Sequence, residues 1–480
     1  MKKNYFLRIS LYIMALILAI CLGISAIGCG SGPVEPVYTS NEKFDIGMWV
    51  GINQTVTTYD ETGTATGTRN LSEEEFDLKY KEIAEAGINI AFPGSFWVGN
   101  FTSNNKALKY AEKYGIRHII LDTDIKDFLL SAYYKAHDGY PRTTLIDELN
   151  ELVAPYKQSE HVNALYGFFF TDEPSSNRFD MLAFAQDIFN EVWPEKILYV
   201  NLFPVIATGT QTGTNYAGYI GNYLNKFNND YLSYDHYPLF GDGFKTWTED
   251  TFLYNMLFIK KQLMDEVAFE ERETERSLWT FLQSVSYSPN HRSILSQADI
   301  SFQANSFLAF GGDCIQWFTY CTPENGGTET FGPAMLDRNL EKTDTYYYVQ
   351  KANSDIQFLM PWYKNFEWQG VMISDVSFED GFGYIKEDEY VISDHDVLKE
   401  FKSTEDAFCG VFSDKDGKSG FMFVNYTDPG KNIENKLELK FEKCTHAVVV
   451  KNGAKEIIKL SGGKTSLNLS SGEGAFVIPY

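Results

Sequence analysis

The chain has 480 residues, more than one ordinary domain of roughly 100 to 200 residues but compatible with a barrel of about 250 residues and a smaller module. Its 41 basic and 65 acidic residues give a formal net charge of −24. This charge repels phosphate backbones and anionic lipid surfaces, so we expect no nucleic-acid partner. The 37 Phe, 30 Tyr and 8 Trp residues suffice for a large core and exclude general disorder.

Residues 1–28 have the layout of a secretion signal, because three cationic residues precede an apolar run over residues 9–27. Small residues stand at positions −3 and −1 before Cys29, which resembles the processing site of a bacterial lipoprotein. We therefore predict lipidation of Cys29, a Gly-, Ser- and Pro-containing tether over residues 29–43, and an extracytoplasmic protein held at the membrane. A retained membrane anchor and ordinary signal cleavage are the alternatives.

Metal and cofactor motifs are missing from the sequence. The seven His residues are scattered and no CxxC pair occurs, so we predict no metal site. There is no GxGxxG after a strand, no GxxxxGK[ST], no GxSxG and no HExxH, so we predict no nucleotide cofactor, serine hydrolase or zinc protease. Cys409 and Cys444 are either a disulfide or free thiols.

Residues 44–360 alternate short apolar runs with amphipathic stretches, a pattern typical of a parallel sheet wrapped by helices. One stretch opens with Ser72 and Glu75, which predicts a capping box, and stops at Gly87. Eight strands close a parallel sheet around a filled interior, so we predict an α/β fold, a (β/α)8 TIM barrel. The predicted strands are residues 44–50, 88–92, 118–121, 165–170, 197–202, 231–234, 278–282 and 314–318.

The C-terminal part of the chain has a different pattern. After a helix predicted around residues 343–359, β-rich segments alternate with turn sequences, and Asn452-Gly453 is typical of a tight hairpin. We predict an antiparallel β-sandwich over residues 365–480. The oligomeric state leaves no readable signal in the sequence.

Acidic side chains follow two of the predicted barrel strands. Asp172-Glu173-Pro174 ends the fourth strand, and Asp235 ends the sixth. Because the C-terminal ends of barrel strands converge on one pocket, apolar walls there can raise a carboxyl pKa toward that of a general acid. The alternative is structural, with Asp172 capping the next turn and Glu173 paired with an arginine.

Amide, imidazole and aromatic groups follow the other strands, and they suit a ring that carries many hydroxyls and one apolar face. We therefore predict a carbohydrate ligand, with long loops over residues 55–70 and 205–229 shaping its pocket. Each candidate has a structural alternative as a core or capping residue. The candidate substrate-binding residues are Asn201, His236, Tyr237, Gln283, Trp317, Tyr320, Trp97 and Trp49.

With these strand ends, the chain resembles the clan A type of (β/α)8 glycoside hydrolases, in particular bacterial surface lipoproteins with a barrel followed by a β-sandwich. The resemblance implies that Glu173 is the acid/base, since Asp172-Glu173-Pro174 stands where the clan has Asn-Glu-Pro. The clan's nucleophilic Glu ends the seventh strand, where this chain has Gln283. An amide cannot be that nucleophile.

Three mechanisms are therefore open. In the first, Glu173 protonates the leaving oxygen while Asp235 acts as nucleophile or as base on water. In the second, Asp172 and Glu173 act like the Asp-Glu pair of hexosaminidases, in which a substrate acetamido group attacks and Tyr237 assists. In the third, another acid replaces the missing one, with Glu324 as the candidate.

The leading functional hypothesis is a cell-surface glycoside hydrolase acting on oligo- or polysaccharides. The alternative is a non-catalytic glycan-binding lipoprotein with a degenerate barrel, motivated by Gln283. A third hypothesis is an adhesive surface protein whose sandwich performs the recognition.

Overall fold

The structure of the chain is a computed structural model. No helix within its described ranges has the length and apolarity needed to cross a bilayer. The predicted signal segment and Cys29 lie outside those ranges. The described residues are 34–60, 64–241, 251–269, 272–287, 290–326, 328–377 and 382–480.

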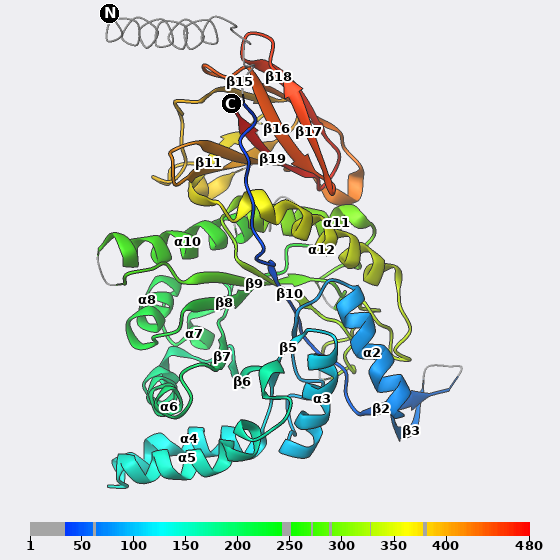
Figure 1. Ribbon diagram of the computed structural model, residues 1–480, viewed down its shortest axis with the longest axis vertical. Helices are drawn as coiled ribbons and strands as arrows, with labels where there is room; N and C mark the ends of the chain where they lie inside the picture. Colours follow the sequence, from blue (N-terminus) through cyan, green and yellow to red (C-terminus); the bar gives the residue numbers. More distant parts are fainter. Residues whose placement is uncertain are drawn as a thin grey trace, which may run out of the picture.

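The eight predicted strands form one parallel sheet (Figure 1). They are β1 (Asp45–Met48), β4 (Ile90–Ala91), β5 (Arg117–Ile120), β6 (Leu165–Asp172), β7 (Ile197–Asn201), β8 (Tyr231–Asp235), β9 (Ser277–Gln283) and β10 (Cys314–Phe318). Their order in the sheet is β7-β6-β5-β4-β1-β10-β9-β8. A parallel bridge between Leu202 and Tyr234 joins the two end strands, and the N–H of Leu202 donates to the carbonyl of Ser233 at 2.8 Å. The TIM-barrel prediction is confirmed.

Helices surround this sheet, and several of them begin at a residue whose side chain caps the first turn, as at Ser72, Asn100 and Asp122. Ser72 accepts from the N–H of Glu75 at 3.1 Å and donates its own N–H to the Glu75 carboxylate at 2.8 Å, which confirms the capping box. Gly87 follows that helix with a φ of 77°, which glycine adopts without strain. The helices are α2 (Glu73–Glu85), α3 (Phe101–Lys113), α4 (Thr123–His137), α5 (Arg142–Lys157), α6 (Phe179–Val192), α7 (Gly209–Thr212), α8 (Tyr216–Lys226), α10 (Leu253–Ala268), α11 (Gln297–Ala309) and α12 (Asp344–Tyr363).

Two segments predicted as loops contain regular structure. The first contains the antiparallel pair of β2 (Thr55–Tyr59) and β3 (Ala65–Asn70), whose side chains are exposed or half-buried. The second loop contains α7 and α8. Sequence patterns understate such elements because little of β2 and β3 is buried, so the apolar alternation that marks a strand is weak.

The C-terminal part folds into two facing antiparallel sheets, and the β-sandwich prediction is confirmed. Asn452 and Gly453 adopt φ values of 51° and 70° between the paired residues Lys451 and Ala454, as a type I′ hairpin requires. One sheet has the order β11-β13-β14-β19-β16-β17, and the other β12-β15-β18. The strands are β11 (Phe366–Ser374), β12 (Leu398–Ser403), β13 (Ala407–Asp414), β14 (Ser419–Asn425), β15 (Asn435–Phe441), β16 (His446–Lys451), β17 (Ala454–Lys459), β18 (Lys464–Leu469) and β19 (Gly474–Pro479).

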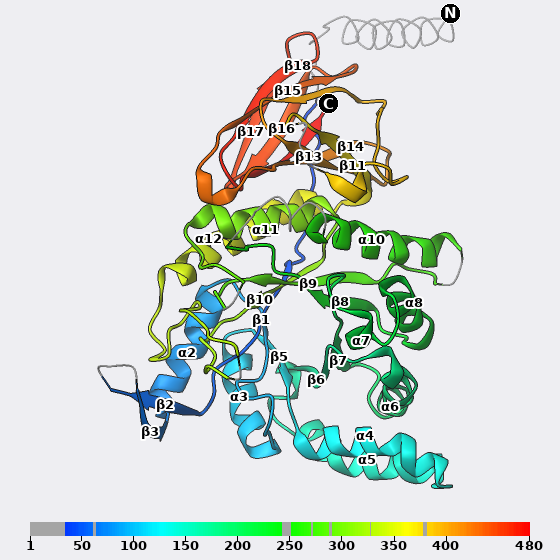
Figure 2. The same cartoon turned by 180° about the vertical axis from the view of Figure 1, so that it is seen from behind.

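Helices α11 and α12 lie between the barrel and the sandwich (Figure 2). Across this layer the indole N–H of Trp368 donates to the carbonyl of Ala309 at 3.0 Å, and Asn305 donates to the carbonyl of Gly472 at 2.9 Å. One apolar cluster continues from the barrel helices into the sandwich, so the two parts share a core.

The four cysteines in the described ranges are free thiols. Cys409 is buried in the sandwich core, and Cys444 lies at its margin, half-buried. The disulfide alternative for this pair is therefore wrong, and the free-thiol alternative is confirmed.

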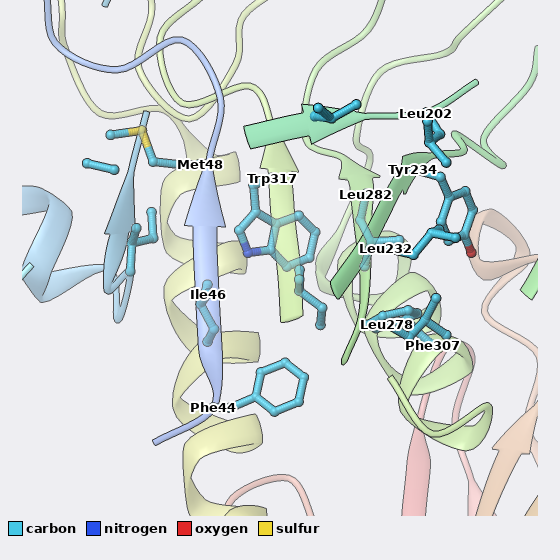
Figure 3. Packing of buried hydrophobic residues seen from close by; sticks show 14 of the residues in the cluster. Phe44, Ile46, Met48, Leu202, Leu232, Tyr234, Leu278, Leu282, Phe307 and Trp317 are labelled. Carbon is cyan, nitrogen blue, oxygen red and sulfur yellow. The ribbon is translucent and has the colours of Figure 1, made fainter. Parts of the chain in front are cut away.

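Two of the residues predicted to bind substrate belong to the core instead. Trp317 is fully buried, and its indole N–H donates to Asn353 on α12 at 3.0 Å. Figure 3 shows Trp317 beside Ile46 and Met48, among the side chains packed against the helices. Successive residues of a strand face opposite sides, so Trp317 faces outward on β10 although it lies near the strand end. Tyr320 is also fully buried, which contradicts a contact with substrate.

Because Trp317 lies in the core, its replacement by a small residue should lower the stability of the fold. Trp317→Ala should lower the free energy of unfolding by about 3–5 kcal/mol, because it leaves a cavity and an unpaired Asn353 side chain. Trp97→Ala is the matched control, since Trp97 is 88% exposed and should change stability by less than about 0.5 kcal/mol. Urea unfolding measures both. Equal stability of the two variants would contradict the assignment.

Candidate active site

A cleft of about 260 Å³ opens at the C-terminal end of the barrel. Three of its residues, Asp172, Asn201 and Asp235, are the last residues of β6, β7 and β8. Glu173, the residue after Asp172, lines the same cleft. The expected convergence of strand ends therefore brings the three predicted catalytic carboxyl groups, those of Asp172, Glu173 and Asp235, together. The lining residues are Trp49, Asp172, Glu173, Asn201, Asp235, Tyr237, Phe281, Tyr287, Phe318, Glu329 and Phe331.

The backbone turns sharply where β6 delivers its two acids. Glu173 has a φ of 43°, a left-handed conformation that is uncommon for a residue with a side chain. Its N–H donates to the carbonyl of Asn201 at 2.9 Å, and the carbonyl of Pro174 accepts from Tyr219 at 2.9 Å. These bonds hold the turn in place, so adjacent residues both present carboxyl groups to the cleft.

The amide of Asn201 lies between two of the carboxylates. Its Nδ2 donates to Asp172 Oδ1 and to Asp235 Oδ1, each at 3.1 Å. Its Oδ1 accepts from the hydroxyl of Ser233 at 2.9 Å, and Ser233 accepts from Gln316 at 2.9 Å. Both amide hydrogens are thus used within the protein, so Asn201 positions the acids, and its contact with substrate stays a prediction.

Burial shifts the proton affinities of the three acids. It raises the pKa of Glu173 to about 7, with the nearby Asp172 charge adding to the effect. It also raises the pKa of Asp235 well above its usual range, again helped by the negative charges of Glu173 and Asp172. Asp172 is accessible at the mouth but surrounded by the cleft walls, and this desolvation raises its pKa to about 6 against the hydrogen bond from Asn201 and the charge of Lys126.

Glu173 and Asp235 hydrogen-bond to each other through their carboxyl groups. Such a bond requires a proton on one of the two carboxyl groups. Because both pKa values are raised, one of the groups still carries a proton at neutral pH. Asp172 is mostly ionised at the same pH, since its pKa is about 6. The cleft therefore combines a proton donor with a carboxylate, the two components needed for general acid catalysis at a centre that develops positive charge.

Aromatic side chains form the walls of the cleft. Trp49, which is 8% exposed, stacks on Phe96 with ring centroids 4.2 Å apart. Tyr237 packs against Phe318 at 5.0 Å and edge-on against Tyr287 at 5.9 Å. Trp49 and Tyr237 thus lie where the sequence predicted them, although their contact with a ligand stays a prediction.

Glu329 and Phe331 are cleft residues that sequence reasoning missed. Both belong to the loop after β10, and no strand periodicity marks them. Arg338 holds this loop by donating to Asn325 at 2.7 Å and to the carbonyl of Phe331 at 3.2 Å. Glu324, the predicted replacement acid, is exposed, hydrogen-bonds Tyr59 and does not line the cleft. Glu329 is the acid that this loop contributes to the cleft.

Three further candidates do not line the cleft. His236 is buried, contacts Asn255 at 3.0 Å, and has its pKa lowered to about 4 by burial, which fits a neutral structural histidine. Gln283 is fully buried and donates to the carbonyls of Val285 at 3.0 Å and Arg292 at 2.8 Å. Trp97 is 88% exposed and is not among the lining residues. The predicted substrate contacts at these positions are not supported.

Within the described ranges, no group of three or more His, Cys, Asp or Glu side chains is arranged to hold a metal ion. The cluster in the cleft consists of carboxyl groups held by one another and by an amide, not by a cation among the lining residues.

In sequence, the chain matches no protein-family model and no curated protein. In structure, it is similar to a beta-galactosidase from Bacillus circulans sp. alkalophilus, with 8% identity and a TM-score of 0.51 over 91% of this chain and 99% of that one. It is also similar to a glycoside hydrolase family 5 protein from Bacteroides vulgatus, with 11% identity and a TM-score of 0.48 over 91% and 88% of the two chains.

A third similarity covers less of each chain. A beta-galactosidase from Marinomonas ef1 matches with 11% identity and a TM-score of 0.39, over 60% of this chain and 58% of that one. The chain likewise spans 58% of a beta-galactosidase from Halorubrum lacusprofundi. The similarity to the Bacillus protein supports a glycosidase-like fold, with a barrel and antiparallel sheets in one chain.

The raised pKa of Glu173 predicts a pH-dependent stability. Folding raises this pKa from 4.5 to about 7, so the folded state holds the proton more tightly and the carboxyl destabilises the fold progressively as pH rises through that window. Glu173→Gln removes the titrating carboxyl and with it this dependence of stability on pH. At about pH 8 the variant should be more stable than the parent, by at most about 3 kcal/mol, and the difference should shrink at about pH 4.

Urea unfolding at both pH values measures this effect. Glu324→Gln is the control, because Glu324 is exposed and should show no such difference between the two pH values. A Glu173→Gln stability difference that does not change with pH would show that the carboxyl is not buried against its neighbours.

Proposed function

We propose that the protein is a glycoside hydrolase that cleaves O-glycosidic bonds of oligo- or polysaccharides, with Glu173 as the general acid. The observation that carries the proposal is the hydrogen-bonded Glu173–Asp235 pair at the C-terminal mouth of a glycosidase-like barrel. A carboxyl with a pKa near 7 can donate a proton to a leaving oxygen at neutral pH. Glycosidic cleavage needs carboxyl groups and no cofactor.

The size and composition of the cleft limit its substrate. Its volume of about 260 Å³ lies below the roughly 300–1,000 Å³ typical of pockets for drug-sized ligands, so it fits about one sugar ring. Its lining combines four carboxyl groups with aromatic side chains and contains no Lys, Arg or His. We therefore infer a neutral sugar in this position, since a uronic or sulfated ring would meet uncompensated negative charge.

The arrangement of the carboxyl groups bears on the role of each acid in the reaction. Paired carboxyl groups in glycosidases stand about 5–5.5 Å apart in retaining enzymes and about 6.5–9.5 Å apart in inverting ones. Glu173 and Asp235 hydrogen-bond to each other, so in the first mechanism the substrate has to break that bond before the two groups act separately. Asp172 is already ionised and fixed by Asn201. This arrangement favours the Asp172–Glu173 mechanism, with Tyr237 beside it and an N-acetylhexosamine as substrate.

The proposal predicts the loss of activity in one acid variant. Glu173→Gln should lower cleavage by about 10²–10⁴-fold, because the amide has no proton to give to the leaving oxygen. Product release from a panel of neutral oligosaccharides, N-acetylhexosaminides and plant, algal and host glycans measures it. Glu324→Gln is the matched control and should cleave like the parent.

Four outcomes separate the candidate functions and mechanisms. Cleavage that survives Glu173→Gln would overturn the proposal. Cleavage restricted to N-acetylhexosaminides would support the Asp172–Glu173 mechanism, and cleavage of glycans without an acetamido group would support the first. Binding of oligosaccharides without any turnover would favour the glycan-binding alternative, which rests on the structural Gln283 in place of the clan's nucleophile.

We also propose that the protein is a surface lipoprotein attached through Cys29, as the signal pattern in residues 1–28 indicates. Cys29→Ser should abolish incorporation of labelled palmitate and move the protein from the membrane to the soluble fraction. Cys21→Ser, within the apolar run of the same leader, is the control and should leave both unchanged. Palmitate labelling that persists in Cys29→Ser would contradict the assignment.

A further inference from the structure

A second cavity, of about 880 Å³, lies at the opposite end of the barrel from the cleft. Its lining includes Asp45, Arg117, Ile197, Tyr231 and Ser277, the first residues of β1, β5, β7, β8 and β9. Since the cleft is lined by the last residues of strands, the two openings lie at opposite ends of a parallel barrel. We call this second cavity the N-terminal funnel.

Aromatic side chains fill the barrel interior between the funnel and the cleft. Tyr231 and Trp279 stack with ring centroids 4.6 Å apart, and Tyr199 stacks on Tyr231 at 5.9 Å. Above them Phe92 packs against Tyr199 at 4.8 Å and against Phe281 at 6.0 Å. These rings belong to one buried cluster, so the funnel is not an extension of the cleft.

Two deeply buried side chains line the funnel with unused hydrogen-bonding atoms. Trp279 is 4% exposed, and no hydrogen bond in the described part of the chain engages its indole N–H. Gln186 is 3% exposed and donates through Nε2 to Asn229, while its Oε1 accepts nothing from the described residues. Neither atom is among the fully enclosed polar atoms that lack a partner, so both are open to the cavity that they line.

The funnel is lined by equal numbers of cations and anions, and two of the anions form ion pairs with cations of the same lining. Asp45 pairs with Arg117, and Asp313 with Lys364 at 3.6 Å. The cations that line the funnel are Lys43, Arg117, Lys196 and Lys364, and the anions are Glu42, Asp45, Asp230 and Asp313.

We propose that the N-terminal funnel is a second, non-catalytic carbohydrate site that binds a neutral oligosaccharide. The indole N–H of Trp279 donates to a sugar oxygen, and the Gln186 amide oxygen accepts from a sugar hydroxyl. A polyhydroxylated ligand satisfies both, whereas the balanced rim gives a charged ligand no advantage. This site goes beyond the proposed function, because it binds glycan at the end of the barrel away from the acids.

Isothermal titration of the full chain carrying Glu173→Gln tests the proposal without turnover. The probes are cellotetraose, xylotetraose, maltotetraose and tetra-N-acetylchitotetraose, with tetragalacturonic acid as the charged control. Asn190→Trp fills the funnel from α6 at a half-buried position, and Trp279→Phe removes only the indole N–H and part of the ring.

We expect two binding events for at least one neutral tetrasaccharide and none for tetragalacturonic acid in the funnel. Asn190→Trp should abolish one event, and Trp279→Phe should weaken the same event by about 5-fold, the worth of one hydrogen bond. In the Glu173-containing chain, Asn190→Trp should cleave like the parent. A single event that Asn190→Trp leaves intact, or no binding at all, would overturn the proposal. Funnel binding without cleavage would instead overturn only the proposed hydrolase activity.

Discussion

The structure depends on one constraint, that the carboxyl groups of Asp172, Glu173 and Asp235 lie together in one small cleft despite their mutual repulsion. The Asn201 amide satisfies this constraint, because its two N–H groups donate hydrogen bonds to Asp172 and Asp235. Ser233 fixes the orientation of that amide, and Gln316 and Tyr199 fix Ser233 in turn. These residues come from three strands, β7, β8 and β10, so the site exists only if the barrel closes between β7 and β8.

Closure of the barrel is therefore a functional requirement as well as a structural one. Asp172 pairs in register with Asn201, and the bridge from Leu202 to Tyr234 lies one residue further along β7. A slip by one residue would turn the Asn201 amide out of the cleft. The raised pKa of Glu173 works against folding at neutral pH, and the aromatic interior and the core shared with the sandwich offset it.

The barrel strands could be predicted from the sequence because each is a short apolar run between helical stretches. The ends of these predicted strands then indicated Asp172, Glu173 and Asp235 as site residues. The sequence did not show which face of a strand a side chain occupies. Trp317 is the example, because it lies near a strand end but points toward α12. Glu329 was out of reach because loop geometry, held by Arg338, brings it to the cleft. Gln283 occupied the expected position, but only the structure shows that its amide bonds to backbone carbonyls.

The two ends of the barrel show how pairing, more than residue type, decides chemistry. Both openings contain several acids and aromatic rings. At the N-terminal end Asp45 and Asp313 form ion pairs with Arg117 and Lys364. At the C-terminal end no cation lines the cleft, so Glu173 and Asp235 hold a proton between them instead. A proton kept in this way can be given to a substrate, which is why we propose acid chemistry at the C-terminal end and binding alone at the N-terminal end.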